Sequence, residues 1–170
     1  MTMKRILYAI AMLGVLFATS CKKDEIGDTA TVDMAGEWYV KVDILDTDGN
    51  VLVEDAFGGS FLISTFNTAE NVPGKMFVYD NDNFWNFQVE LVADPASKTF
   101  KTDGFKDNLA YDGCQVNVKD GKIVYGGTET PSGVKADYIE LTVEFSDDPY
   151  FGVCMYRLYG FRYTGLASDD

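Results

Sequence analysis

The sequence predicts an all-β fold, an antiparallel up-and-down β-barrel of about eight strands or, as the alternative, a β-sandwich. Apolar and polar residues alternate with the period of a half-buried strand in many short runs, and turn sequences such as Asp-Gly separate these runs. Aromatic residues make up 14% of the chain, which suits strands and a large apolar interior. Because the turns are too short for parallel crossovers, we expect antiparallel strands.

The first strand is predicted in the run "GEWYVKVDIL", residues 36–45. Trp38, Val40, Val42 and Ile44 fall on one face of it, and the turn "TDGN" follows. Further strands are predicted in segments 51–55, 60–66, 75–80, 84–92, 99–102, 113–119, 122–126, 138–145 and 153–163. A closed barrel or a sandwich would bury the apolar faces and protect the sheet edges.

The apolar faces of these strands include candidate ligand-binding residues. An eight-stranded barrel has room for one small ligand, and aromatic inward faces favour a hydrophobic one. Six residues lie on the apolar face of a predicted strand and are candidates for this role: Trp85, Phe87, Val89, Tyr125, Leu141 and Val143. The alternative is that the same side chains fill the interior, since folding requires apolar faces whether or not a ligand exists.

The chain begins with a segment typical of a secretory signal peptide. Two basic residues precede an apolar run of twelve residues, from Ile6 to Phe17. A membrane-spanning helix needs about 20 apolar residues, so this run is too short to be an anchor helix. Small residues then lead to Cys21. The alternatives are an ordinary signal peptide followed by a chance cysteine, and a short buried helix.

The end of this segment resembles the bacterial lipobox, where a signal peptidase cuts before a cysteine that carries lipid. The resemblance implies lipidation at Cys21 and attachment to a membrane through the acyl chains. The residues that follow, "KKDE", resemble the sorting signal of Bacteroidetes outer-membrane lipoproteins, which implies a lipid-anchored protein exposed on the cell surface. The predicted organisation is a signal peptide over 1–20, a lipidated cysteine and flexible tether over 21–32, a β-barrel domain over 33–166 and a polar tail over 167–170.

Composition argues against several classes of function. The chain has 14 basic and 27 acidic residues, so nucleic acid is not an expected partner, because affinity for phosphates comes from lysine and arginine. It has no histidine, which excludes Ser-His-Asp and Cys-His mechanisms and histidine-built metal sites. The acidic turns "DTDGN" and "DNDN" have the residues of hairpin turns, and we expect no metal and no cofactor.

Cys114 and Cys154 are the only cysteines after Cys21. A compartment outside the cytoplasm permits a disulfide between them, but two buried thiols fit equally well.

Two stretches resemble known families. The Gly36-Glu37-Trp38 sequence is similar to the Gly-x-Trp of lipocalins and other calycins, in which an arginine of the last strand covers the tryptophan at one barrel end. Arg157 and Arg162, both in the last predicted strand, are candidates for that arginine, and a guanidinium stacked on Trp38 would make a favourable cation–π contact. The resemblance implies a calycin-like barrel with Gly36, Trp38, Arg157 and Arg162 as barrel-closing residues.

The last quarter of the chain, "SDDPYFGVCMYRLYGFRYTGLASDD", looks like the end of the Bacteroidetes lipoproteins called lipid-binding putative hydrolases. Gly160, Arg162, Thr164 and Gly165 match the Gly-x-Arg-x-Thr-Gly turn of that family. The resemblance implies an outer-membrane lipoprotein whose barrel binds a small hydrophobic ligand.

Two other functions are compatible with the sequence. A surface accessory protein could bind a glycan or an outer-membrane protein through exposed aromatic residues such as Tyr150 and Phe151. A hydrolase without histidine would need a carboxylate pair or a Ser-Lys nucleophile, and no Gly-x-Ser-x-Gly sequence marks a serine.

Overall fold

The computed structural model describes residues 28–169, so the predicted signal peptide, Cys21 and the first part of the tether lie outside the described residues, as does Asp170. The described part contains one short 3-10 helix and ten strands. Their bounds are η1 Val32–Met34, β1 Gly36–Asp46, β2 Val51–Val53, β3 Phe61–Asn67, β4 Lys75–Tyr79, β5 Gln88–Asp94, β6 Thr99–Lys101, β7 Lys106–Asp107, β8 Gln115–Glu129, β9 Lys135–Phe145 and β10 Cys154–Arg162.

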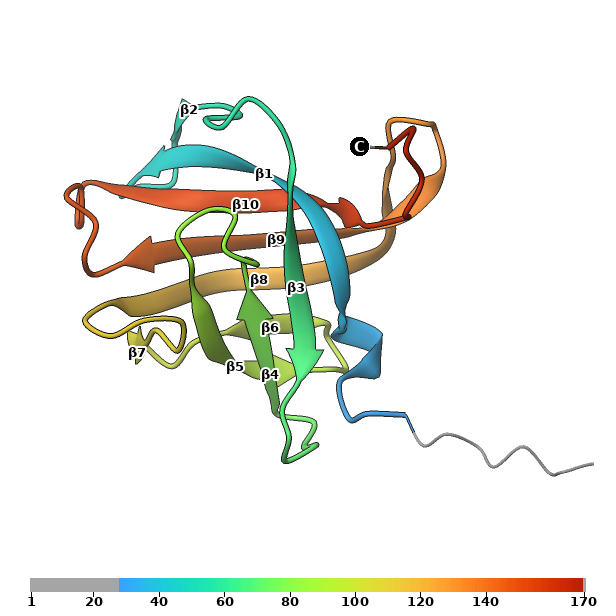
Figure 1. Cartoon of the computed structure of the whole chain (residues 1–170), viewed down its shortest axis with the longest axis horizontal. Coiled ribbons are helices and arrows are strands. Elements are labelled where there is room, and N and C mark those ends of the chain that lie inside the picture. Colours follow the sequence, from blue (N-terminus) through green and yellow to red (C-terminus); the bar gives the residue numbers. More distant parts are fainter. Residues whose placement is uncertain (1–27, 170) are drawn as a thin grey trace, which may run out of the picture.

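Eight of these strands close an antiparallel barrel, which confirms the predicted fold class (Figure 1). The order is β10-β9-β8-β6-β5-β4-β3-β1, and the pairing of β1 with β10 joins the first strand to the last. β2 and β7 lie outside this ring. Sequence neighbours are therefore spatial neighbours, as in an up-and-down barrel, and closure leaves no free edge among the eight strands.

Apolar side chains fill the barrel. Alternate residues of each strand point inward, and many of them have no exposed surface. The residues that are 0% exposed include Trp38, Val40, Val42, Ile63, Met76, Val78, Val89, Val116, Ile139, Leu141, Val143 and Leu158 of the strands and Phe87 just before β5. No space as large as a water molecule adjoins these side chains. Of the two interpretations of the apolar faces, the structure therefore favours an interior filled by side chains.

The end of the barrel at which β1 begins is closed by a tryptophan and an arginine. Arg162 lies over the ring of Trp38 with its guanidinium carbon 4.3 Å from the ring centroid. It also donates hydrogen bonds to Asp137 at 3.0 Å and to the carbonyl of Ala35 at 2.8 Å. The indole N–H of Trp38 donates to the Thr65 hydroxyl at 2.8 Å. We call this end the closed end.

The segment before β1 packs across the closed end. The backbone N–H of Ala30 donates to Asn71, and the hydroxyl of Thr31 donates to Asn67. Asp33 pairs with Lys98 at 2.9 Å. Thr31 and Met34 are 0% exposed. The last residues of the predicted tether are thus part of the barrel's packing, and the chain enters the domain at this end (Figure 1).

No helix within residues 28–169 is both long enough and apolar enough to cross a membrane. Cys114 and Cys154 are both buried, and both are free thiols.

Candidate functional site

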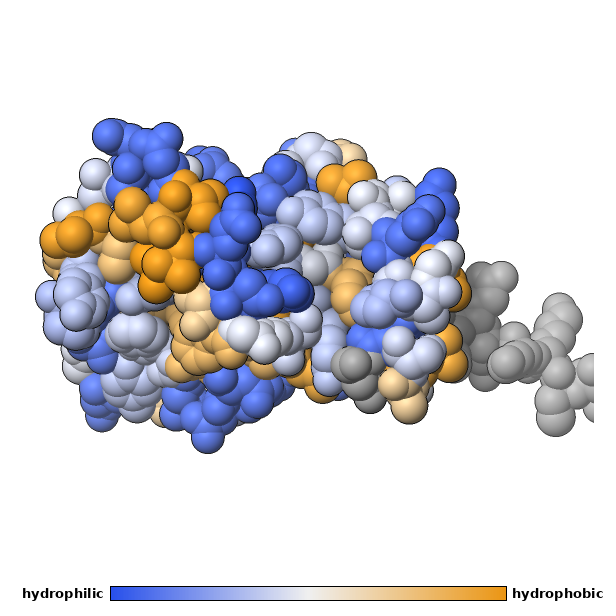
Figure 2. All heavy atoms as spheres, turned by 90° about the horizontal axis from the view of Figure 1, so that it is seen from above, coloured by the Kyte–Doolittle hydropathy of each residue, from blue (hydrophilic) through white to orange (hydrophobic). Residues whose placement is uncertain are grey.

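The end of the barrel opposite the closed end is formed by four connections, and we call it the mouth. They are residues 47–60, 80–87, 102–114 and 146–153, and they include the outlying strands β2 and β7. Each connection joins two barrel strands at this end, so residues far apart in the sequence meet here. Figure 2 shows hydrophobic residues gathered on the surface at the end of the molecule where β2 lies.

A cluster of aromatic rings blocks the opening. Trp85 stacks on Phe145, with the centroids 4.6 Å apart and the planes 3° from parallel. Phe84 makes edge contacts with both of these rings and with Tyr156, at centroid distances of 5.3 to 5.8 Å. On its other side Phe84 contacts Phe57 at 5.2 Å. The fully buried Phe87 lies against Phe145 at 5.3 Å, so the cluster continues the packing of the interior.

The loop that carries Phe84 and Trp85 is organised by the buried carboxylate of Asp80. This side chain is 0% exposed. It accepts hydrogen bonds of 2.7 to 3.2 Å from five backbone N–H groups, those of Asp82, Phe84, Trp85, Asn86 and Phe87. The N–H of Asp80 in turn donates to the carbonyl of Phe87 at 3.1 Å. One acidic residue thereby satisfies the backbone donors of a loop that has no strand partner.

A second carboxylate fixes the outer edge of the aromatic cluster. Asp147 accepts hydrogen bonds from the indole N–H of Trp85 at 3.1 Å and from the hydroxyl of Tyr111 at 2.6 Å. Burial opposes ionisation of Asp147, but hydrogen bonds from Tyr111, Cys114 and Trp85 outweigh it, so the pKa of Asp147 lies below its usual value. Desolvation and the bond to Asp147 together raise the pKa of Tyr111, which stays a neutral donor.

Exposed apolar side chains surround the aromatic cluster. Tyr150 and Val153 are each 63% exposed, and Phe151 is 51% exposed against the ring of Phe105 at 5.6 Å. Leu52, Phe57 and Leu109 on the neighbouring connections are also exposed. A group of exposed apolar side chains at one end of a molecule is typical of a binding surface, whereas single exposed ones are normal.

The structure separates the six predicted ligand-binding residues into three groups. Trp85 and Phe87 lie in the aromatic cluster at the mouth. Val89, Leu141 and Val143 lie in the packed interior and are 0% exposed. Tyr125 is 52% exposed near the closed end, where its hydroxyl donates to the carbonyl of Asp33 at 2.7 Å.

A shift of strand register explains the place of Tyr125. The pairing of β8 with β9 is irregular between Val124 and Thr128, so the alternation of inward and outward side chains is interrupted there. Ile123 remains inside at 4% exposed, whereas Val124 and Tyr125 both lie at the surface.

Of the four predicted closing residues, Arg157 lies apart from the others. Gly36, Trp38 and Arg162 meet at the closed end. Arg157 is paired across the β1–β10 ladder with Asp43 and forms an ion pair with its carboxylate. Asp43 lies on the outer face of the barrel but is only 1% exposed, and it accepts a hydrogen bond from the backbone N–H of Asp55. Arg157 therefore stabilises the fold of the 47–60 connection.

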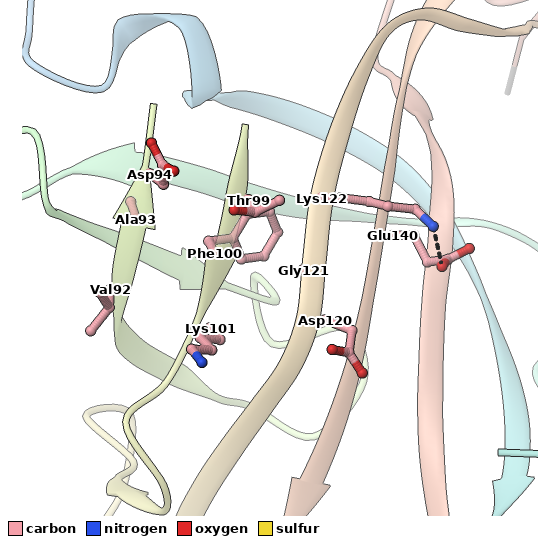
Figure 3. A pocket seen from close by; sticks show the side chains of 10 residues that line it. All are labelled: Val92, Ala93, Asp94, Thr99, Phe100, Lys101, Asp120, Gly121, Lys122 and Glu140. Atoms are coloured by element: carbon pink, nitrogen blue, oxygen red, sulfur yellow. Dashed lines mark ion pairs between the residues drawn. The ribbon is translucent and has the colours of Figure 1, made fainter. Parts of the chain in front are cut away.

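A groove of about 470 Å³ opens on the outside of the barrel, where β6 meets β8. Figure 3 shows the ring of Phe100 between these strands, and Lys122 directed at Glu140, with which it forms an ion pair of 2.9 Å. The ring occupies the space that Gly121 leaves, because a Cβ there would lie 2.3 Å from it. None of the six predicted ligand-binding residues lines this groove, and its charged residues have both signs.

No group of three or more acidic or cysteine side chains within residues 28–169 is arranged to hold a metal ion. The two acidic turns "DTDGN" and "DNDN" use their carboxylates on the backbone: Asp46 accepts from the N–H groups of Asp48 and Asn50, and Asp80 holds the 80–87 loop.

The sequence also matches a family of known proteins. The sequence model of a family described as lipid-binding putative hydrolase matches residues 23–167. No curated protein matches the chain.

Proposed function

The chain belongs to the lipid-binding putative hydrolase family, and from this premise we propose that it binds a hydrophobic, lipid-like ligand at the mouth of the barrel. The observation that carries the proposal is the aromatic cluster at the mouth, in which Phe84 and Trp85 are partly exposed, with its ring of exposed apolar side chains. Covering such a surface with a ligand is favourable, because each Å² of apolar area removed from water contributes about 25 cal/mol to binding.

The packed interior supports the mouth as the site. An acyl chain inside the barrel would have to displace side chains such as Val89 and Leu141, which have no exposed surface. At the mouth, a ligand needs only to cover or displace Phe84 and Trp85, which belong to a loop and not to a strand. Apolar residues of the neighbouring connections would then cover the rest of the ligand.

We further propose that the protein is a lipoprotein anchored to the outer membrane through Cys21 and exposed at the cell surface. The lipobox-like sequence before Cys21 and the lysine and acidic residues "KKDE" after it support this. Ten residues lead from Cys21 to the buried Thr31, and they reach at most about 35 Å. Because Thr31 packs at the closed end, the anchor and the mouth would lie at opposite ends of the barrel.

The mouth supports binding better than it supports hydrolysis. Asp80 and Asp147 already accept hydrogen bonds from the backbone, Tyr111 and Trp85. Burial raises the pKa of the Cys114 thiol, which lies near Asp147, so this cysteine is not a thiolate at neutral pH. The binding of a glycan or protein partner at Tyr150 and Phe151 is the second candidate, because these rings are exposed at the same end.

The test is binding of an uncharged amphiphile, n-dodecyl maltoside, below its critical micelle concentration. Calorimetry and the fluorescence of Trp85 should both report saturable binding, and the fluorescence change should disappear in Trp85→Phe. The variant Tyr150→Ala/Phe151→Ala should bind roughly tenfold more weakly, because two of the exposed rings are lost.

The matched control is Phe66→Ala/Phe77→Ala, which removes an aromatic pair from β3 and β4, away from the mouth. It should bind like the unchanged protein. Absence of binding, or equal losses in the two double variants, would refute the mouth as a lipid site. If the protein binds soluble glycans but does not bind the amphiphile, the second candidate is favoured.

A further inference from the structure

Charge is distributed unequally between the two ends of the barrel. The four connections of the mouth carry ten acidic residues, which are Asp48, Glu54, Asp55, Asp80, Asp82, Asp103, Asp107, Asp112, Asp147 and Asp148. Lys106 is their single basic residue. The three connections at the closed end, residues 68–74, 95–98 and 130–134, carry one acid and one base, Glu70 and Lys98. The terminal segments that pack at this end add Asp28, Asp33 and Asp169. The mouth therefore has the larger excess of acidic over basic residues.

Most of these carboxylates are available at the surface. Asp80 and Asp148 are buried, and Asp55 pairs with Lys41. The other seven are exposed, and none of them forms an ion pair with a basic side chain of the described residues; they are Asp48, Glu54, Asp82, Asp103, Asp107, Asp112 and Asp147. Asp147 lies directly beside the aromatic cluster, with a carboxylate oxygen 3.1 Å from the indole nitrogen of Trp85.

The mouth thus combines an apolar centre with an acidic surrounding. A ligand whose hydrocarbon chain lies on Phe84 and Trp85 would hold its head group among the carboxylates of the same loops. A negatively charged head group would be repelled there, whereas a positively charged one would be attracted by the carboxylates and by the faces of the aromatic rings.

We propose that the mouth selects amphiphiles with a positively charged head group, such as amine-bearing lipids, over fatty acids and other anionic amphiphiles. This inference rests on the proposed function, because it names the class of ligand for the same site. The occupant is argued from charge complementarity between the seven exposed carboxylates and the head group. Each exposed ion pair contributes little, so selectivity arises from several carboxylates acting together.

The experiment compares three amphiphiles with the same twelve-carbon chain, all below their critical micelle concentrations. They are dodecyltrimethylammonium, n-dodecyl maltoside and dodecyl sulfate. At low salt we expect the cationic compound to bind roughly tenfold more tightly than the neutral one, and the anionic compound to bind most weakly. In about 1 M salt the three affinities should converge, because the Debye length falls to about 3 Å.

Two variants with the same change of net charge locate the effect. Glu54→Gln/Asp82→Asn/Asp112→Asn removes three exposed carboxylates from the mouth, and it should reduce the preference for the cation while leaving the affinity for the maltoside unchanged. Asp28→Asn/Glu37→Gln/Glu129→Gln removes three exposed carboxylates away from the mouth, and it should leave the preference intact.

The outcomes separate this inference from the proposed function. If the maltoside binds but the cationic and anionic compounds bind within twofold of each other, the inference is wrong and the lipid site stands. Equal loss of preference in both triple variants would also overturn it, since only the net charge would then matter. If the maltoside does not bind, both are wrong, even if the cation binds to the acidic surface alone.

Discussion

The guanidinium of Arg162 lies over the ring of Trp38, 4.3 Å from its centroid, in a space that Gly36 leaves open. A Cβ added to Gly36 would lie 2.2 Å from the Nη1 atom of Arg162. Because Arg162 pairs with Trp38 across the β1–β10 ladder, the same contact joins the first and last strands of the barrel. Closure of the sheet and closure of this barrel end therefore depend on the same three residues.

Replacement of this arginine by lysine is the first test of that dependence. Arg162→Lys keeps the charge but loses the planar stacking and the paired bonds to Asp137 and Ala35, so we expect a loss of about 2 kcal/mol in the free energy of unfolding. Urea unfolding followed by tryptophan fluorescence measures it. Lys101→Met, which changes an exposed cation without an ion pair among the described residues, is the control and should cost less than about 0.5 kcal/mol. Equal effects would contradict the assigned role.

Gly36→Ala should destabilise the barrel by about 1 to 3 kcal/mol, because its methyl group occupies the place of the Arg162 guanidinium. The loss should be smaller when Arg162→Met is already present, since the methyl group then displaces no charged partner. A double-mutant cycle of the two changes measures this coupling. Strict additivity would show that the alanine acts through the backbone alone.

Asp80→Asn should loosen the loop that carries Phe84 and Trp85. The carboxylate of Asp80 offers two acceptor oxygens to five backbone N–H groups, whereas the amide has only one acceptor oxygen. We therefore expect a loss of roughly 3 kcal/mol in stability and a red shift of Trp85 emission. Asp82→Asn, an exposed change in the same loop, should alter neither. An unchanged emission spectrum for Asp80→Asn would mean that the loop is held by its aromatic contacts.

Asp169 connects the C-terminal segment to the β8–β9 turn and should do so in a pH-dependent way. Hydrogen bonds from Thr164 and Ser132 lower its pKa to about 2. A carboxyl with a lowered pKa contributes stability above its unfolded pKa of about 3.9 and loses it as the pH falls toward 2. Asp169→Asn should therefore be less stable than the unchanged protein at pH 6, with a difference that shrinks below pH 4. A pKa near 4 for Asp169 by NMR would contradict this.

The thiol content of the membrane-extracted protein tests two assignments together. Cys114 and Cys154 are free and buried, so the folded protein should react slowly with a thiol reagent. Unfolding without reductant should release two thiols if Cys21 carries lipid through its sulfur. Three reactive thiols would show that Cys21 is unmodified. If Cys21 is modified and no thiol reacts, Cys114 and Cys154 form a disulfide.

Strand alternation carries most of the information about the fold. The alternation predicts a strand over residues 138–145 with Leu141 and Val143 inside, and β9 contains this segment with both residues fully buried. A strand between a packed interior and water leaves such an alternation in the sequence. The Gly-x-Trp sequence also indicated the closed end, where Gly36 and Trp38 lie together with Arg162.

Alternation fails where a buried polar group determines the backbone. The run 84–92 alternates throughout, yet β5 begins only at Gln88, because the carboxylate of Asp80 holds residues 82–87 as a loop. Asp43 would be expected at the outer surface, but the 47–60 connection covers it. Both cases depend on contacts between segments that the local pattern does not contain.

The mouth as a unit was not predictable from the sequence. Its aromatic and acidic residues come from four connections, and each connection alone has the composition of an ordinary turn. Only the barrel topology brings them to one end. Phe84, Tyr150 and Phe151 stand out in the sequence as aromatic residues near turns, which is the one signal that could have led to this surface.

The separation between the two ends of the barrel has a consequence for how such a protein can diversify. Gly36, Trp38 and Arg162 hold the closed end through strands β1 and β10, whereas the proposed ligand surface is built from four connections that take no part in that contact. Substitutions and insertions in these connections can change what is bound while barrel closure is preserved. The same barrel can therefore serve as a scaffold for grafted loops, with new specificities installed at the mouth alone.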